Sequence, residues 1–271
     1  MKPFKRALVM GILNVTPDSF FDGGLYATKE SAIERGLEMI SQGADYIDVG
    51  GESSRPGAQP VSSEVELERV IPVIEGLRKE GIKNISIDTV KSDVAYSAVK
   101  AGANLINDIS ASLIQVASEL KVGYVIMHMQ GNPQIMQDKP IYKSVVDDVE
   151  NFLLSRATVA TNSGINNIWI DPGIGFGKTV KQNLKLLGSI DRLVKSDFPV
   201  LIGTSRKSFI GALALDTNGF PAPVDERLAG SLASVVFALE KGVSMVRVHD
   251  VKETVEAACL VAAMSEGVVL E

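Results

Sequence analysis

Apolar residues recur along this chain in eight short runs, and each run ends in polar, charged or glycine residues. Segments with the three-to-four-residue spacing of amphipathic helices separate the runs. The repeated order of strand, polar loop and helix is typical of parallel βα units, and eight units predict a (β/α)8 barrel. The eight endings read MGILNVTPDSF, YIDVGGESSRPG, ISIDT, LINDIS, VIMHMQG, IWIDPGIGFG, VLIGTSRKS and MVRVHD.

The same pattern gives approximate bounds for the elements. We expect strands near residues 7–14, 44–50, 83–88, 103–108, 123–128, 166–171, 198–204 and 243–248. We expect helices near residues 28–42, 62–80, 91–101, 112–120, 141–163, 179–196, 224–241 and 251–265. Four glycines follow helices where a left-handed stop is needed: Gly43, Gly81, Gly102 and Gly242.

The length of 271 residues suits one such barrel, since (β/α)8 domains typically have about 250 residues. No Pro/Ser-rich linker, charge block or low-complexity stretch marks a second domain. We therefore expect a single α/β domain over residues 1–271. It should be a (β/α)8 TIM barrel whose active site lies at the C-terminal ends of the strands.

Alternation within the strands predicts which side chains face the barrel interior. In MVRVHD, Val246 and Val248 share the phase that packs under the helices, so Arg247 and His249 face inward. The same reasoning directs polar side chains from five strands toward one mouth: Asn14, Asp88, Asn107, Asp171, Arg247 and His249. Polar side chains there are poor for packing and suitable for binding.

Three further residues carry expectations about burial. Trp169, in phase with Asp171, should fill the barrel interior. His128, in phase with Tyr124, should point inward, as a structural histidine or a substrate contact. Cys259 should be a buried filler on the apolar face of the last helix. A single cysteine excludes an internal disulfide, and with only two histidines a zinc site is not expected.

The net charge of −6, without a lysine or arginine run, argues against nucleic acid and anionic membranes as partners. An anionic small-molecule substrate must then be held by a few placed cations. The start of the chain resembles a signal peptide, but Asn14, Pro17 and Asp18 interrupt it. No run approaches the ~20 apolar residues of a membrane span. We therefore expect a cytoplasmic protein.

Donor groups at the predicted mouth suit a phosphate or diphosphate, because arginine offers paired donors. These groups are Asn14, Arg55, Lys207, Arg247 and His249. The oxygen of Asn14 also suits Mg2+, which often takes only one or two protein ligands when diphosphate oxygens supply the others. A surface ion pair is the alternative for both arginines.

A second group at the mouth consists of Asp88, Asn107 and Asp171. Two carboxylates can perform acid–base chemistry on sugars. An amide between them, however, suits recognition of the edge of a flat heterocycle. A carboxylate complements an amino group beside a ring N–H, as in guanine and pterins. The alternative for both aspartates is a structural role, in which the side chain caps a helix or forms hydrogen bonds within a loop.

The segment GIGFGKT at residues 173–179 looks like a phosphate loop but lacks the full G-x-x-x-x-G-K-[ST] spacing. Its glycines are expected to let the backbone approach a flat ligand. Phe176 would then stack on that ligand or cover it.

Together these motifs resemble the dihydropteroate synthase family. The resemblance runs from residue 10 to residue 251 and rests on seven motifs in the family's order: NVTPDSF, GGESSRPG, SIDT, INDIS, DPGIGFGKT, SRKSFIG and RVHDV. It implies a transferase of folate biosynthesis with Mg2+ as cofactor. Such an enzyme condenses (7,8-dihydropterin-6-yl)methyl diphosphate with p-aminobenzoate to give 7,8-dihydropteroate and diphosphate.

The resemblance also implies roles for the matching residues. The pterin pocket would comprise Asp88, Asn107, Asp171 and Lys207. The diphosphate site would comprise Asn14, also the Mg2+ ligand, with Ser54, Arg55, Arg247 and His249. The p-aminobenzoate site would comprise Ser54, Arg55, Pro56, Phe176, Lys207 and Ser208. The catalytic set would be Asp88, Asp171, Lys207 and Arg55, with Asp22 on the first loop taking the amine proton.

Three positions depart from the family pattern. Ser54 stands where the family usually has threonine, and Phe21 where its first loop commonly has serine. After GFGKT the chain has Gln182 and Asn183, where a histidine–asparagine pair is frequent. Because residue 182 lies at a helix start, we expect a change of cap or packing there.

Two other functions stay open. One is a pterin-binding methyltransferase domain, and the other is a non-catalytic pterin-binding scaffold. The SRKSF and GGESSRPG motifs, which suit a carboxylate and a diphosphate, argue against the first. The presence of both the loops and the anion residues argues against the second. The resemblance further implies a homodimer formed through the late helices.

Overall fold

The computed structural model describes residues 6–16, 25–54, 57–131, 136, 140–215 and 219–265. Within these residues eight strands form one sheet, and every strand pair in it is parallel. The strands are β1 (Leu8–Asn14), β2 (Tyr46–Gly50), β3 (Ile85–Asp88), β4 (Leu105–Asp108), β5 (Gly123–Met127), β6 (Ile168–Asp171), β7 (Leu201–Ile202) and β8 (Met245–Val248).

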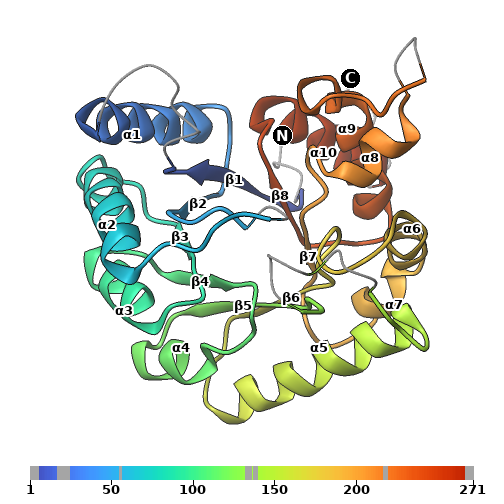
Figure 1. The fold of residues 1–271 in the computed structure, drawn as a ribbon, viewed down its shortest axis with the longest axis horizontal. Helices are drawn as coiled ribbons and strands as arrows, with labels where there is room; N and C mark the ends of the chain where they lie inside the picture. Colours follow the sequence, from blue (N-terminus) through green and yellow to red (C-terminus); the bar gives the residue numbers. More distant parts are fainter. Residues whose placement is uncertain are drawn as a thin grey trace.

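Helices follow the strands along the chain and surround the sheet (Figure 1). They are α1 (Leu25–Ser41), α2 (Ser63–Lys79), α3 (Ser92–Ala101), α4 (Ile114–Leu120), α5 (Val145–Asn162), α6 (Val180–Gly188), α7 (Ile190–Val194), α8 (Ser208–Leu213), α9 (Leu228–Glu240) and α10 (Val251–Ser265), with a 3-10 turn at Val224–Glu226.

The strand order is β6-β5-β4-β3-β2-β1-β8-β7, and a bridge between β6 and the start of β7 closes the ring. Ile170 pairs there with Val200, and its N–H donates to the Pro199 carbonyl over 3.0 Å. The predicted (β/α)8 barrel is therefore confirmed. Figure 1 shows the ring of strands inside the ring of helices.

Two apolar layers fill the molecule, as the strand alternation predicts. The barrel interior holds Met10, Leu105, Val125, Trp169, Leu201 and Met245. The opposite phase of each strand packs beneath the helices, for example Ile106, Ile126 and Val246. The prediction that Trp169 fills the barrel is therefore confirmed.

The prediction that His128 points inward is wrong. Tyr124 and Ile126 belong to the layer beneath the helices, whereas Val125 belongs to the barrel interior. His128 shares the helix-facing phase, and its ring lies edge-on to Phe152 of α5, with 5.1 Å between centroids. In β5 the inward-facing phase is that of Val125, not that of Tyr124 and Ile126.

Most predicted bounds agree with the structure to within a few residues, and the differences have local causes. The helix predicted over 179–196 is interrupted at Ser189, whose ψ of 15° ends α6 before α7 begins. The strand predicted over 198–204 shrinks to two residues. Helix α8 was not predicted. The four glycines predicted to stop helices all have positive φ, and Cys259 is exposed rather than buried.

Candidate active site

The register of the parallel strands places four residues in one row at the C-terminal end of the barrel. Asn14 pairs with Gly50, Gly50 pairs with Asp88, and Asp88 pairs with Asn107. A side chain at Gly50 would fill the space between its neighbours, since a Cβ there would lie 3.6 Å from Asn14 Oδ1 and 3.8 Å from Asp88 Oδ2. The glycine thus leaves these two oxygens facing a shared space.

An arginine from β8, the strand beside β1, reaches across the barrel mouth to this row. Arg247 donates from Nε to Asp48 Oδ2 and from Nη2 to Asp88 Oδ2, each over 2.6 Å. Asn107 Nδ2 donates to the same Asp48 oxygen over 2.9 Å. The pairing is not the surface ion pair considered as the alternative for Arg247, because Asp48 is 0% exposed.

Asp48 is a site residue that the sequence reasoning missed. It lies at the centre of β2 and is in phase with Gly50, so the same alternation that selected Asp88 would have directed it inward. Asp48 sits two residues before the end of its strand, whereas the predicted site residues lie at or next to the strand ends.

The charges at the mouth strongly affect one another. The pKa of Asp88 is raised to about 7, mainly by burial; Arg247 opposes the shift, and the nearby Asp48 contributes to it. Burial disfavours the charge of Arg247, but Asp48 and Asp88 together keep its pKa above the usual range. The two aspartates and the arginine therefore act as one coupled group.

Asp171 and Lys207 form the second part of the mouth. Asp171 Oδ1 accepts the N–H of Gly173 over 2.7 Å, so the loop hydrogen bond considered as an alternative is present. Burial raises the pKa of Asp171, and Lys207 is the main group opposing that shift. Burial likewise lowers the pKa of Lys207 to about 8. Lys207 Nζ donates to the Ile174 carbonyl and lies 4.6 Å from the centroid of the Phe176 ring.

Two glycines of the 173–177 loop have a packing role that the sequence did not indicate. A Cβ at Gly173 would lie 1.9 Å from the His128 carbonyl oxygen, and one at Gly177 would lie 2.5 Å from the Gln130 carbonyl oxygen. These glycines therefore let the loop approach the backbone that follows β5. The Cβ position of Gly175 lies 3.0 Å from the Cδ of the site residue Lys207.

The loop is held by two buried residues that were not predicted as functional. Lys178 is 2% exposed, and its Nζ donates to the carbonyls of Gly173 and Phe176 over 2.9 Å each. Asn183 Oδ1 accepts the N–H of Gly175 over 2.7 Å. A lysine and an asparagine followed the glycine motif in the sequence, but only the folded chain places them beneath it.

Gln182, which departs from the family pattern, takes part in a helix cap. Thr179 Oγ1 accepts the N–H of Gln182 over 3.2 Å, and Gln182 Oε1 accepts the N–H of Thr179 over 2.8 Å. This reciprocal pair is a capping box at the start of α6. It fixes the point at which the glycine loop ends.

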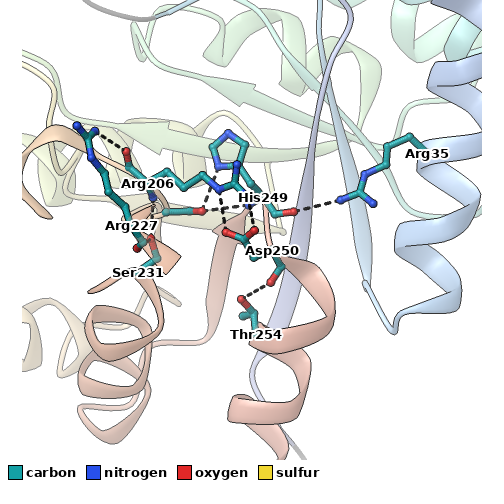
Figure 2. A network of polar contacts seen from close by, with 8 residues as sticks. Arg35, Arg206, Arg227, Ser231, His249, Asp250 and Thr254 are labelled. Atoms are coloured by element: carbon teal, nitrogen blue, oxygen red, sulfur yellow. Dashed lines mark hydrogen bonds and ion pairs between the residues drawn. The ribbon is translucent and has the colours of Figure 1, made fainter. Parts of the chain in front are cut away.

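Residues after β7 and β8 form a polar network beside the mouth (Figure 2). Ser205 Oγ accepts the backbone N–H of His249 over 3.1 Å and lies 3.0 Å from its Nδ1. A hydroxyl that accepts this amide and donates its own proton to Nδ1 leaves the ring proton on Nε2. Arg206 forms a bidentate ion pair with Asp250. The Arg206 carbonyl accepts a hydrogen bond from Arg227, which directly precedes α9.

A cavity of about 270 Å³ opens beside Asp88. Its lining comes from the loops after β2, β3, β4 and β5 and includes Ser54, which the structure thus brings beside Asp88. Lys91 borders the same cavity and is paired with Glu52 and with the buried Glu66.

The remaining predicted residues fall into two groups. Ser208 begins α8 and is exposed directly after Lys207. Arg55, Pro56 and Asp22 lie outside the described residues, as do the positions of Asp18 and Phe21.

Among the described residues there is no group of three or more histidine, cysteine or acidic side chains arranged to hold a metal. Asn14 Oδ1 faces the space above Gly50 and can supply one oxygen ligand. This fits an ion that takes most of its ligands from a diphosphate and from water. It does not fit a metal held by protein side chains alone.

Comparisons with known proteins agree with this geometry. The model of the family described as "Pterin binding enzyme" matches residues 10–249. The dihydropteroate synthase of Streptococcus pyogenes serotype M6 is 45% identical over 254 residues, which are 91% of each chain.

Solved structures give the same result. The Xanthomonas albilineans dihydropteroate synthase with 4-aminobenzoic acid is 44% identical and superposes with a TM-score of 0.88, covering 97% of this chain and 94% of that one. The same organism's enzyme in complex with 7,8-dihydropteroate is 40% identical, with a TM-score of 0.84 and coverage of 97% and 95%. The chain therefore belongs to the dihydropteroate synthase family of pterin-binding enzymes.

Proposed function

We propose that the protein is the transferase that condenses (7,8-dihydropterin-6-yl)methyl diphosphate with p-aminobenzoate, releasing 7,8-dihydropteroate and diphosphate. One observation carries the proposal: buried and half-buried acceptors and cations from five strands converge at one mouth, in a chain 45% identical to a named dihydropteroate synthase. Other synthases have been solved with 4-aminobenzoic acid and with 7,8-dihydropteroate, the second substrate and the product of this reaction.

The acceptors would hold the pterin. Asp88, Asn107 and Asp171 lie where a flat ring can offer its N–H donors to them, and Lys207 can donate to ring acceptors. Because these groups are buried, a ligand that lacks matching donors would leave them without partners, which is costly. The pocket thus selects for the hydrogen-bonding edge of the ring.

The cations would hold the diphosphate. Arg247 uses two of its N–H donors on aspartates, and a guanidinium has five in all, so the same fork can also reach a diphosphate. His249, with its Nδ1 next to Ser205, would contribute its Nε2–H. Ser54 and Arg55 would complete this site from the β2–α2 loop.

In the reaction the C–O bond breaks and its electron pair leaves with the diphosphate. The carbon left behind is conjugated with the electron-rich pterin, and the nearby carboxylates of Asp88 and Asp171 would stabilise its positive charge. The amine nitrogen of p-aminobenzoate then forms the new C–N bond and loses a proton to Asp22 or to water. Phe176, Lys207, Ser208 and Pro56 would position this second substrate.

Mg2+ would be held by Asn14 together with diphosphate oxygens, and when bound it would neutralise charge on the leaving group. Asn14 itself keeps an oxygen directed at the mouth, next to Asp88.

We also propose a homodimer formed through α9 and α10. Phe237 is 45% exposed on α9 and lines a surface groove with Leu232 and Val236. On the adjacent α10, Leu260 and Met264 are each about 60% exposed. An apolar surface of this kind marks an interaction site.

No helix in the described part of the chain has the length and apolar character needed to span a bilayer. The single cysteine suits a reducing compartment, and we therefore propose the cytoplasm as its location.

The activity is tested by incubating the protein with the pterin diphosphate, p-aminobenzoate and Mg2+, and measuring the release of diphosphate together with formation of dihydropteroate. We expect both products in equal amounts and only when p-aminobenzoate is present. Asp88→Asn is the control, since it removes a carboxylate from the mouth. Pterin binding without p-aminobenzoate-dependent release would instead support a methyltransferase domain or a non-catalytic scaffold.

A further inference from the structure

Lys178, the buried lysine beneath the 173–177 loop, has no part in the mechanism above. Burial lowers the pKa of its amine to about 7, and the nearby Asp171 opposes this shift. Its Nζ lies within 3.2 Å of four acceptors: the carbonyls of Gly173, Phe176 and His128, and His128 Nδ1. An ammonium group has three donors, so all of them can be used by protein groups. The donors of Lys178 Nζ are thus used by acceptors in the two loops that follow β5 and β6.

His128 is suited to this contact because it is uncharged. The pKa of His128 is lowered to about 3, mainly by burial and in part by the neighbouring Lys178. A neutral ring can accept a hydrogen bond through Nδ1. The edge-on contact of this ring with Phe152 of α5 fixes the acceptor in place.

The residues tied by Lys178 lead directly to the mouth. Phe176 presents its ring to Lys207 Nζ, 4.6 Å from the ring centroid. The carbonyl of Ile174, in the same loop, accepts a hydrogen bond from that Nζ. The positions of Phe176 and of Lys207 therefore depend on a loop whose carbonyls converge on Lys178.

Other contacts of the loop do not replace this one. Asn183 holds the N–H of Gly175, and Asp171 holds the N–H of Gly173. Both contacts fix amide groups. Among the described residues, Lys178 is the side chain that donates to both the Gly173 and the Phe176 carbonyls. It also donates to the His128 carbonyl and so connects the loop to the backbone after β5.

We propose that Lys178 is a positioning residue that sets the p-aminobenzoate subsite by holding Phe176 and Lys207 from behind. The identity of that substrate rests on the proposed function, whereas the tie between Lys178 and the loop does not. Lys178 contacts no reacting atom in this arrangement, so it acts through the loop alone.

The test compares Lys178→Met with Lys181→Met. Methionine keeps most of the length of lysine and removes the donors, and Lys181 is an exposed lysine in the first turn of α6. Steady-state kinetics would give kcat and a KM for each substrate. We expect Lys178→Met to raise the KM for p-aminobenzoate about tenfold or more and to leave the KM for the pterin diphosphate within about twofold. Lys181→Met should match the parent in both.

Hydrogen exchange of the loop amides supplies a readout that needs no activity. We expect the amides of residues 173–176 to exchange about tenfold faster in Lys178→Met, because the loop can then open without breaking the hydrogen bonds that Lys178 Nζ donates to its carbonyls. An unchanged exchange rate in a folded variant would overturn the proposal, as would equal rises in both KM values. A parent protein without activity would contradict the proposed function but leave the exchange test intact.

Lys178→Arg provides a second variant in case the methionine variant does not fold. It keeps the positive charge, but a planar guanidinium cannot place its donors on the same converging carbonyls. We expect the same selective rise in KM for p-aminobenzoate with a smaller loss of thermal stability. Parent-like KM values in Lys178→Arg would show that charge alone suffices and would refute the positioning role.

Discussion

At the scale of single residues, Arg247 does not belong to one half of the site. The sequence assigned it to the diphosphate and assigned Asp88 to the pterin, but the two form an ion pair of 2.6 Å. Asp48 extends this pairing to Asn107. Removing one member of a buried ion pair leaves the other charge uncompensated, which costs several kcal/mol.

Replacement of Arg247 by methionine should therefore weaken pterin binding as well as diphosphate binding. We expect a phosphate-free pterin analogue to bind at least about tenfold more weakly, because Asp88 loses the cation that keeps it charged. Isothermal titration measures this directly. His249→Gln is the control and should retain the analogue. Parent-like affinity in Arg247→Met would instead show that the pterin site and the diphosphate site are independent, as the sequence suggested.

The pH dependence of pterin binding should report on Asp88. Its pKa is raised by burial to about 7, so the carboxylate needed to accept ring donors is lost as pH falls through that value. We expect the dissociation constant of a pterin analogue to rise about tenfold per pH unit below this point. Titrations from about pH 5 to about pH 9, on both sides of the raised pKa, would measure it. Asp88→Asn should lack this step, and a step that persists in that variant would assign it to another group.

At the scale of elements, the loop between β6 and α6 shows how a glycine can serve packing rather than ligand approach. Gly173 combines a φ of +66° with a Cβ position 1.9 Å from the His128 carbonyl oxygen. An L-residue there would be both strained and in collision with backbone, so the loop after β5 or the loop after β6 would have to move.

Gly173→Ala should consequently be much more destabilising than a glycine substitution that brings strain alone. Gly164 provides the match, since it has a φ of +85° and no atom within 4 Å of its Cβ position. We expect Gly164→Ala to cost about 1 kcal/mol and Gly173→Ala several times more, measured by urea unfolding. Equal losses of unfolding free energy in the two variants would mean that the loops after β5 and β6 can move apart at little cost.

At the scale of the whole molecule, the helix layer is not equally polar around the barrel. Apolar side chains on α9 and α10 lie on the surface of the chain, namely Phe237, Leu260 and Met264. The neighbouring Cys259 is exposed in the same helix, which is why the expectation that it is a buried filler failed. If a second copy of the chain covered this surface, that would explain why α10 carries apolar side chains on its outer face as well as on its inner face.

A charge placed in this surface should separate the subunits. We expect Phe237→Glu to sediment as a monomer at concentrations where the parent is a dimer, because the carboxylate would be desolvated on association. Ile141→Glu is the control, since Ile141 is also strongly exposed but lies before α5. Analytical ultracentrifugation of the three proteins is decisive, and a parent that is monomeric would contradict the proposed homodimer.

The sequence by itself determined the barrel and most of the mouth. Strand alternation has a period of two, and in a barrel the loops after parallel strands share one end, so Asn14, Asp88, Asn107 and Asp171 could be directed to one place without coordinates. The same local rule would have found Asp48. A single domain over residues 1–271 and the roles given to Arg55, Pro56 and Asp22 stay predictions.

Only the tertiary structure decided which of these groups face one another. Arg247 and Asp88 are 159 positions apart in the chain, and no local pattern states that one neutralises the other. The same holds for Lys178, which reads as part of a glycine-rich loop but lies 50 positions from the His128 that it contacts. Periodicity fixes the direction of a side chain relative to its own strand, whereas pairing and charge compensation depend on distances across the closed barrel.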